Sequence, residues 1–176
     1  MKNKFYIILC ITSCLYAHTS EYEINLYGLN VAKCKVQIKD TTLYNKESIK
    51  IEYIVKSTNL MKWIFNVDNY YTTIIDKNNR NILHYSKRSI QPKVNNQIST
   101  IYNNGNVSYL GTDLHINNND YNIFSLLYAV SLGEEDFKKK NIIIDREGKK
   151  YLGQINLTDI NTYDLDLTEI NINNDG

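Results

Sequence analysis

The sequence has little cysteine, proline, glycine or histidine, and it has no long apolar run. Two of its three cysteines, Cys10 and Cys14, lie within residues 1–17, so Cys34 would have no internal partner for a disulfide bond. With one proline and seven glycines, the chain offers no Gly-rich phosphate loop behind a strand. No apolar run reaches the roughly 20 residues that a membrane-spanning helix requires. These absences argue against a disulfide scaffold, a phosphate loop and a stable transmembrane anchor.

The chain also lacks an excess of charge of either sign. Its 20 Lys and Arg residues and 19 Asp and Glu residues give a formal net charge of +1. Loss of residues 1–17 would remove Lys2 and Lys4 but no acid, and would change the net charge to −1. A chain so close to neutral has no electrostatic reason to bind nucleic acid or an anionic membrane surface. We therefore expect no nucleic-acid partner, and membrane association only through a lipid anchor.

Residues 1–17 have the order of an export signal. Lys2 and Lys4 precede an apolar run at residues 5–16, which ends at Ala17 before a polar segment. This order predicts a signal peptide over residues 1–17 and a protein of the periplasm or cell envelope. Two alternatives stay open: residues 11–14 also fit a lipoprotein signal, with lipidation of Cys14 and a membrane anchor, and the signal could remain uncleaved.

Tyrosine and short alternating runs, in contrast, are abundant. Apolar and polar residues alternate over about ten runs that are joined by hairpin-length links, without the spacing of βαβ units. This pattern predicts an antiparallel sheet. The expected strands are residues 22–26, 31–38, 49–55, 67–75, 82–90, 97–102, 107–110, 141–145, 151–158 and 163–172. Residues 59–65 break the alternation and contain the only tryptophan, so we expect a single helical turn there.

One helix is expected within residues 119–133. Asp120 or Asn122 can cap its first turn, and Gly133 can end it. Apolar residues recur at helical spacing between these positions and leave little polar surface, so the helix needs cover. The sequence therefore predicts a mainly β fold: a curved antiparallel sheet, a half-barrel-like meander, with one main helix packed on its concave side. We expect residues 18–176 to form a single domain.

Several of these segments together resemble the DUF3108 family of exported bacterial proteins of unknown function. The resemblance rests on Tyr22-Glu23-Ile24 with Gly28 and Ala32, the strand pair around Tyr70 and Arg88, the segment at residues 120–128, and the strand pair after Gly148. It implies an envelope protein with a curved antiparallel sheet, similar in outline to lipoprotein carriers whose half-barrel holds acyl chains. It implies no catalytic residues. Family members usually continue through further strands, so the end at residue 176 implies an open sheet edge or a truncated chain.

No recognisable catalytic constellation is present. Asp113 and His115 would lie on the same side of a strand and could share a proton or bind a metal weakly, but a loop position explains them as well. Asp164 and Asp166 match the DxDxT string of haloacid-dehalogenase-like enzymes. That string belongs at the end of an early parallel strand, whereas here it lies near the C-terminus. We therefore expect a protein that is not an enzyme and has no metal or cofactor.

Two functions fit the sequence best. The first is a carrier of an apolar or lipid-like ligand, because the tyrosine-rich strands and the apolar helix would provide apolar walls on both sides of a gap. The second is a structural or assembly factor that acts through contacts with another envelope protein, for example at a free sheet edge. The residues expected to line the ligand cavity are Tyr53, Trp63, Phe65, Tyr71, Phe124, Leu127 and Tyr128.

Overall fold

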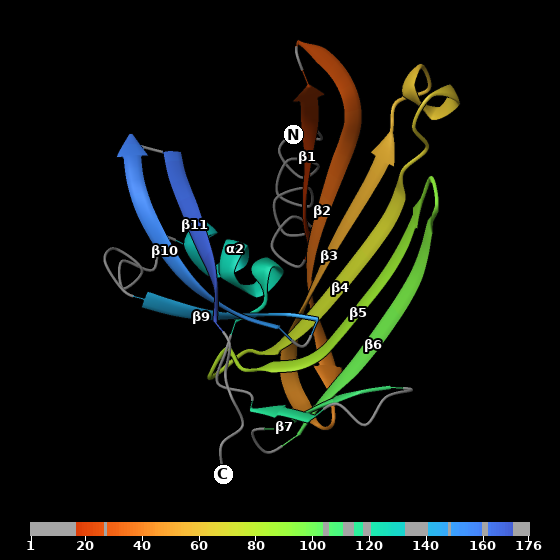
Figure 1. Ribbon diagram of the computed structural model, residues 1–176. Coiled ribbons are helices and arrows are strands. Elements are labelled where there is room, and N and C mark those ends of the chain that lie inside the picture. The colour runs from red at the N-terminus through yellow and green to blue at the C-terminus, as the bar shows by residue number, and fades with distance from the viewer. Residues whose placement is uncertain are drawn as a thin grey trace, which may run out of the picture. The chain divides into compact units, whose positions relative to one another are not determined.

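A computed structural model describes residues 17–26, 28–103, 106–110, 115–117, 121–132, 141–147, 149–159 and 162–170 (Figure 1). Most of these residues form strands. The strands are β1 (Ala17–Leu26), β2 (Leu29–Leu43), β3 (Lys46–Ser57), β4 (Asp68–Asp76), β5 (Ile82–Gln91), β6 (Val94–Asn103), β7 (Asn106–Tyr109), β8 (His115–Asn117), β9 (Asn141–Arg146), β10 (Lys149–Asp159) and β11 (Thr162–Ile170). The helical elements are the short 3₁₀ helix η1 (Met61–Trp63) and the α-helix α2 (Ile123–Ser131).

The strands form two antiparallel sheets. The first has the order β1 to β8 as in the sequence, and the second has the order β11-β10-β9. Because β1 and β8 stand at opposite ends of this order, the first sheet is not closed into a barrel. Figure 1 shows β1 to β6 lying side by side and bending together. The predicted fold class, mainly β with an open, curved antiparallel sheet and one α-helix among the described residues, is confirmed.

Contacts divide the chain into two compact units. Unit 1 covers residues 1–101 and 109–111, and unit 2 covers residues 102–108 and 112–176. The single domain expected at residues 18–176 stays a prediction, because contacts within a chain do not test independent folding. Residues 1–16, which include most of the expected signal peptide and Cys14, the alternative lipidation site, lie outside the described residues. No described helix has the length and apolarity that crossing a membrane requires.

In unit 1 the alternation of side chains gives the sheet two different faces. On β3, Ile49, Ile51, Tyr53 and Val55 lie on one face, which we call the apolar face. Register pairs Tyr53 with Tyr71 on β4, and it pairs Ile51 with Thr73. The centre of the apolar face is closed to solvent. The buried side chains there are Ile49, Ile51, Thr73, Ile75 and Thr100.

In unit 2, α2 begins at the cap predicted from the sequence. The Asn122 side chain accepts hydrogen bonds from the backbone N–H groups of Phe124 (3.0 Å) and Ser125 (2.8 Å), and Ser125 Oγ accepts one from Asn122 N. This reciprocal pattern is a capping box. Gly133, expected to end the helix, lies outside the described residues.

The buried side of α2 packs on β9. Leu126 and Ala129 form a cluster with Ile142 and Ile144 of that strand. These contacts lie within unit 2. The packing of the helix on the concave side of the long sheet therefore stays a prediction.

Candidate functional site

The apolar face of unit 1 holds two of the residues expected to line a ligand cavity. Tyr53 and Tyr71 are direct cross-strand neighbours on β3 and β4, and both are half-buried. Burial raises the pKa of Tyr53 to about 12, with smaller contributions from Cys34 and Tyr22 on the same face. The phenol therefore stays uncharged at neutral pH and presents an aromatic surface with a polar tip.

One line of paired residues that crosses the strands of this face changes from apolar on β2 and β3 to polar on β4 and β5. Register aligns Cys34 on β2 with Val55, Val55 with Asn69 on β4, and Asn69 with Ser89 on β5. Asn69 and Ser89 are only 4% and 2% exposed, respectively. Neither Asn69 Oδ1 nor Ser89 Oγ has a hydrogen-bond partner within the described structure. Each such atom costs about 1–3 kcal/mol unless another group satisfies it.

A third unpaired atom lies at the same end of the apolar face. Asn30 Oδ1, near the start of β2, is buried and has no partner among the described residues. Alternation along β2 places Asn30 on the same face as Ala32 and Cys34. The apolar face thus ends in a group of buried polar atoms, which we call the polar end: Asn30, Asn69 and Ser89. Water or the polar head of a ligand could complete their hydrogen bonds.

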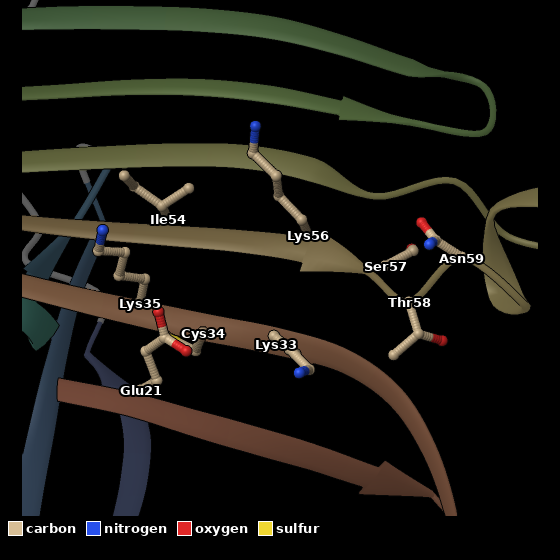
Figure 2. Close-up of a pocket in the computed structure, with 9 residues that line it drawn as sticks. All are labelled: Glu21, Lys33, Cys34, Lys35, Ile54, Lys56, Ser57, Thr58 and Asn59. Carbon is tan, nitrogen blue, oxygen red and sulfur yellow. The ribbon is translucent and has the colours of Figure 1, made fainter.

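The opposite face of unit 1 is charged and contains a hollow of about 530 Å³ (Figure 2). The hollow is shallow and spans β1, β2 and β3. Figure 2 shows that Lys35, Ile54 and Lys56 project from neighbouring strands along the same side. The lining residues are Glu21, Lys33, Cys34, Lys35, Ile54, Lys56, Ser57, Thr58 and Asn59; Cys34 and Ser57 border the hollow although their strand positions belong to the apolar face.

Carboxylates balance most of the positive charge around this hollow. Lys56 Nζ lies 3.3 Å from Asp68 Oδ1 and 4.9 Å from the centre of the Tyr70 ring. Hydrogen bonding to Tyr70 and then to Asp68 raises the pKa of Lys56. On β1, Glu21 lies opposite Lys35 in the register, and Glu23 lies opposite Lys33. The hollow is therefore a mixed-charge surface and not a concentrated anion site.

Two other expected cavity residues lie on the surface. Trp63 is 93% exposed and Phe65 is 48% exposed. Both belong to the connection between β3 and β4, where η1 confirms the helical turn expected at residues 59–65. Sequence reasoning identified these aromatic side chains as apolar surface, but it gave no sign that they project into solvent.

The remaining expected cavity residues belong to α2 in unit 2. Phe124 and Tyr128 are half-buried, and Leu127 is 45% exposed. The structure thus brings Tyr53 and Tyr71 together and places Trp63 and Phe65 at the edge of the same unit. A shared cavity formed by all seven residues stays a prediction.

The residues weighed for catalysis are described only in part. Asp113 lies outside the described residues, and of His115 only the backbone of β8 is described. Asp164 and Asp166 lie on β11, which pairs antiparallel with β10 and so differs from the parallel strand that carries this string in haloacid dehalogenases. Among the described residues, no group of three or more His, Cys, Asp or Glu side chains could hold a metal ion.

Cys34, which is free and is the one cysteine among the described residues, is half-buried on the apolar face. Burial raises the pKa of its thiol. A protonated, half-buried thiol behaves as a small apolar side chain, as the sequence predicted.

The sequence analysis did not identify the residues of the polar end. Asparagine is so frequent in this chain that Asn30 and Asn69 do not stand out, and Ser89 fits an alternating strand. The one available signal is positional. Asn69 and Ser89 fall where the alternation of β4 and β5 calls for inward-facing residues.

Comparisons with known proteins identify a family. The family described as "Protein of unknown function (DUF3108)" matches residues 21–131, which include most of β1, all of β2 to β8, and α2. No curated protein matches the chain, and no solved structure matches it. The match covers more than half of the chain, and this chain therefore belongs to the DUF3108 family.

Proposed function

We propose that unit 1 is a non-enzymatic binding module for an apolar, lipid-like ligand with an uncharged hydrogen-bonding head. The apolar part of the ligand lies against the half-buried side chains of Tyr53, Val55 and Tyr71. Its head forms hydrogen bonds with Asn69 and Ser89. On this proposal the protein is a carrier of the periplasm or cell envelope, and its expected export signal at residues 1–17 agrees with that location.

The observation that carries the proposal is the pair of unpaired polar atoms. Asn69 and Ser89 are register partners, both are buried, and neither polar atom has a partner within the described residues. Proteins pair the great majority of buried polar groups, so two adjacent exceptions on one face need an explanation. A ligand head that accepts a hydrogen bond from Ser89 Oγ and donates one to Asn69 Oδ1 would explain why both atoms have no partner within the described residues.

The charge around this pair favours an uncharged head. Asn69 and Ser89 are neutral, and Lys87, which lies opposite Tyr71 on the same face, already has a partner of its own. Within the described part of the chain, register places no other cation beside the two polar groups on this face, so an anionic head would lose its hydration without a compensating charge. That loss is costly in a buried position.

A second candidate function is the assembly factor. Strand β1 stands at the end of the sheet order, and Tyr22 and Ile24 on it are exposed. An exposed edge strand can pair with an extended segment of a partner protein. The neighbouring Glu21 and Glu23 are also exposed, and charged side chains on an edge discourage unspecific pairing.

Equilibrium binding of two fluorescent probes tests the proposed ligand site. A pyrene-labelled fatty alcohol carries a hydrogen-bonding head, whereas a pyrene-labelled alkane of equal length does not. Ser89→Ala should weaken binding of the alcohol about 5- to 10-fold, the worth of one hydrogen bond, and leave alkane binding unchanged. Ser86→Ala is the matched control, because Ser86 lies on the same strand but faces the other side of the sheet.

The same titration identifies failure of the proposal. If neither probe binds, or if Ser89→Ala and Ser86→Ala bind the alcohol equally well, unit 1 does not hold a ligand head at this position. Stoichiometric crosslinking of a partner protein to β1 without probe binding would favour the assembly factor.

A further inference from the structure

The connection between β3 and β4 carries an unusual amount of exposed apolar surface. Leu60 is 75% exposed, Trp63 is 93% exposed and Ile64 is 76% exposed, and Phe65 adds a half-exposed ring. We call residues 60–65 the apolar tip. Figure 1 shows the turn of η1 beyond the end of the β3 arrow, where the chain passes from β3 to β4. Isolated exposed apolar residues are ordinary, but four within six positions mark an interaction surface.

Four of the six backbone N–H groups of the apolar tip donate to carbonyl groups close by in the chain. Met61 N and Lys62 N both donate to Thr58 O at 3.0 Å, and Ile64 N and Phe65 N donate to Met61 O at 3.0 and 2.7 Å. A segment that enters the apolar part of a bilayer must leave few backbone groups without partners. The local bonds of these four N–H groups lower the cost of bringing the tip to the boundary of a bilayer.

The tip is also held firmly by the sheet behind it. Ser57 Oγ donates to Phe65 O at 2.7 Å and accepts from Val67 N at 2.8 Å. Thr58 N donates to Val31 O at 3.1 Å, and Thr58 Oγ1 donates to Asn30 O at 3.2 Å. Because these bonds fix both ends of the connection, docking would order few residues and would cost little conformational entropy.

The apolar tip carries one charged residue, Lys62, which is positive. Lys56, on the strand that leads into the tip, is paired with Asp68 at 3.3 Å. Lys62 lies inside the tip, and its long side chain can reach water or a phosphate while its stem stays in apolar surroundings. The tip thus combines an exposed tryptophan with a lysine, a composition found at the boundary between lipid and water.

We infer that the apolar tip docks the protein on the surface of a lipid bilayer, with Leu60, Trp63 and Ile64 entering the boundary region. This docking does not rest on the ligand site of the apolar face. A protein partner fits less well, because each side of a standard protein interface contributes about 20–30 residues, and the tip offers six. A bilayer needs no complementary shape and accepts a narrow tip.

Trp63 provides a direct test, because it is the only tryptophan of the chain. The full chain is mixed with phosphatidylcholine vesicles, with and without phosphatidylglycerol, and Trp63 emission is recorded. We expect a shift of the emission to shorter wavelength and quenching by brominated lipids. The emission of Trp63 is needed because it reports on the tip itself, whereas the apolar run at residues 5–16 could also hold the chain on vesicles.

Two substitutions that keep Trp63 sharpen the test. Leu60→Ser and Ile64→Ser should each lower vesicle partitioning, as read by Trp63 emission, by about tenfold or more. Leu110→Ser is the matched control, because Leu110 is 58% exposed elsewhere in unit 1. All three positions are on the surface, so thermal unfolding should show that the variants remain folded.

Three results would overturn the inference. One is Trp63 emission that does not respond to vesicles, and another is equal partitioning of Leu60→Ser and Leu110→Ser. The third is a Trp63 response that occurs with a crosslinked envelope protein and not with vesicles, which would assign the tip to a protein partner. If the vesicle response appears and the fatty-alcohol probe does not bind, docking stands and the proposed ligand site fails.

Discussion

At the scale of single residues, two buried serines of unit 1 have opposite surroundings. The Ser57 hydroxyl makes two hydrogen bonds, to Phe65 O and from Val67 N, whereas Ser89 Oγ has no partner within the described structure. Both side chains are buried, so bulk water reaches a missing hydrogen bond less freely than it would at the surface. A residue kept in an unfavourable position is expected where binding, and not stability, determines its identity.

Removing the two hydroxyls should therefore have opposite effects on the unliganded protein. Ser57→Ala should lower the free energy of unfolding by about 1–2 kcal/mol, because two backbone groups lose their partner. Ser89→Ala should leave it unchanged or raise it by about 1 kcal/mol, because a buried unpaired group disappears. Urea unfolding at constant m measures both. A loss for Ser89→Ala as large as that for Ser57→Ala would mean that its hydroxyl is satisfied within the fold.

The ionisation of Tyr53 should make the stability of unit 1 depend on pH. Burial raises its pKa to about 12 in the folded chain, against an ordinary value of about 10 in the unfolded chain. Between these values the unfolded chain releases a proton that the folded chain keeps, so the free energy of unfolding falls as pH rises. At pH 11 the loss from this residue should be about 1 kcal/mol or less, since the ring is partly exposed to solvent.

The substitution Tyr53→Phe removes this phenol hydroxyl. The free energy of unfolding should then fall less between pH 8 and pH 11. Urea unfolding of both proteins at pH 8 and pH 11 gives the comparison. Parallel declines in the two proteins would show that the phenol ionises as readily in the folded chain as in the unfolded one.

At the scale of elements, alternation and capping residues predicted most of the strands and the start of α2. The alternation of apolar and polar residues correctly predicted β3, because Ile49, Ile51, Tyr53 and Val55 lie on the same face. Asn122 was one of the two predicted caps, and its short amide side chain reaches the N–H groups of Phe124 and Ser125. The side of α2 that packs was less predictable, because apolar residues surround the helix and Leu127 is among the exposed ones.

The cap gives a prediction for unit 2. Asn122→Ala removes the acceptor of two hydrogen bonds and should lower the free energy of unfolding by about 1–2 kcal/mol. Ser131→Ala, at the other end of the helix, removes an exposed hydroxyl that bonds within its own turn and should cost less than about 0.5 kcal/mol. Thermal or urea unfolding followed by circular dichroism compares the two. Equal costs would mean that packing on β9 alone positions α2.

The connection between β3 and β4 shows a helical turn that the sequence predicted and an exposure of its apolar side chains that the sequence did not predict. The sequence revealed that residues 59–65 leave the strand period and are apolar, which suggested a buried wall. Their exposure depends on bonds between distant residues, such as Thr58 N to Val31 O. Such contacts follow from the pairing of β2 with β3, and local periodicity does not contain them.

At the scale of the whole molecule, the net charge hides local differences. A total of +1 gave no reason to expect binding to an anionic membrane surface. Yet the acids are placed largely opposite lysines on the charged face, while the apolar tip carries Lys62 and no acid. Association through the tip would depend mainly on apolar burial, and added salt should weaken it only modestly.

The two proposals describe one working arrangement of unit 1. The apolar tip brings the sheet to a bilayer, and the apolar face, ending in Asn30, Asn69 and Ser89, holds a lipid-like molecule. The tip and the polar end lie at the same end of β3, because Thr58 bonds to Asn30 O and Val55 pairs with Asn69. A ligand would therefore have a short path between the bilayer and its site.

Native mass spectrometry of the protein extracted from cell membranes tests the central claim, ligand binding on the apolar face, most directly. The account predicts a one-to-one complex with an apolar molecule that organic solvent removes, and a clear loss of occupancy in Ser89→Ala but not in Ser86→Ala. A protein that carries no such molecule in either form, extracted under the same gentle conditions, would contradict it.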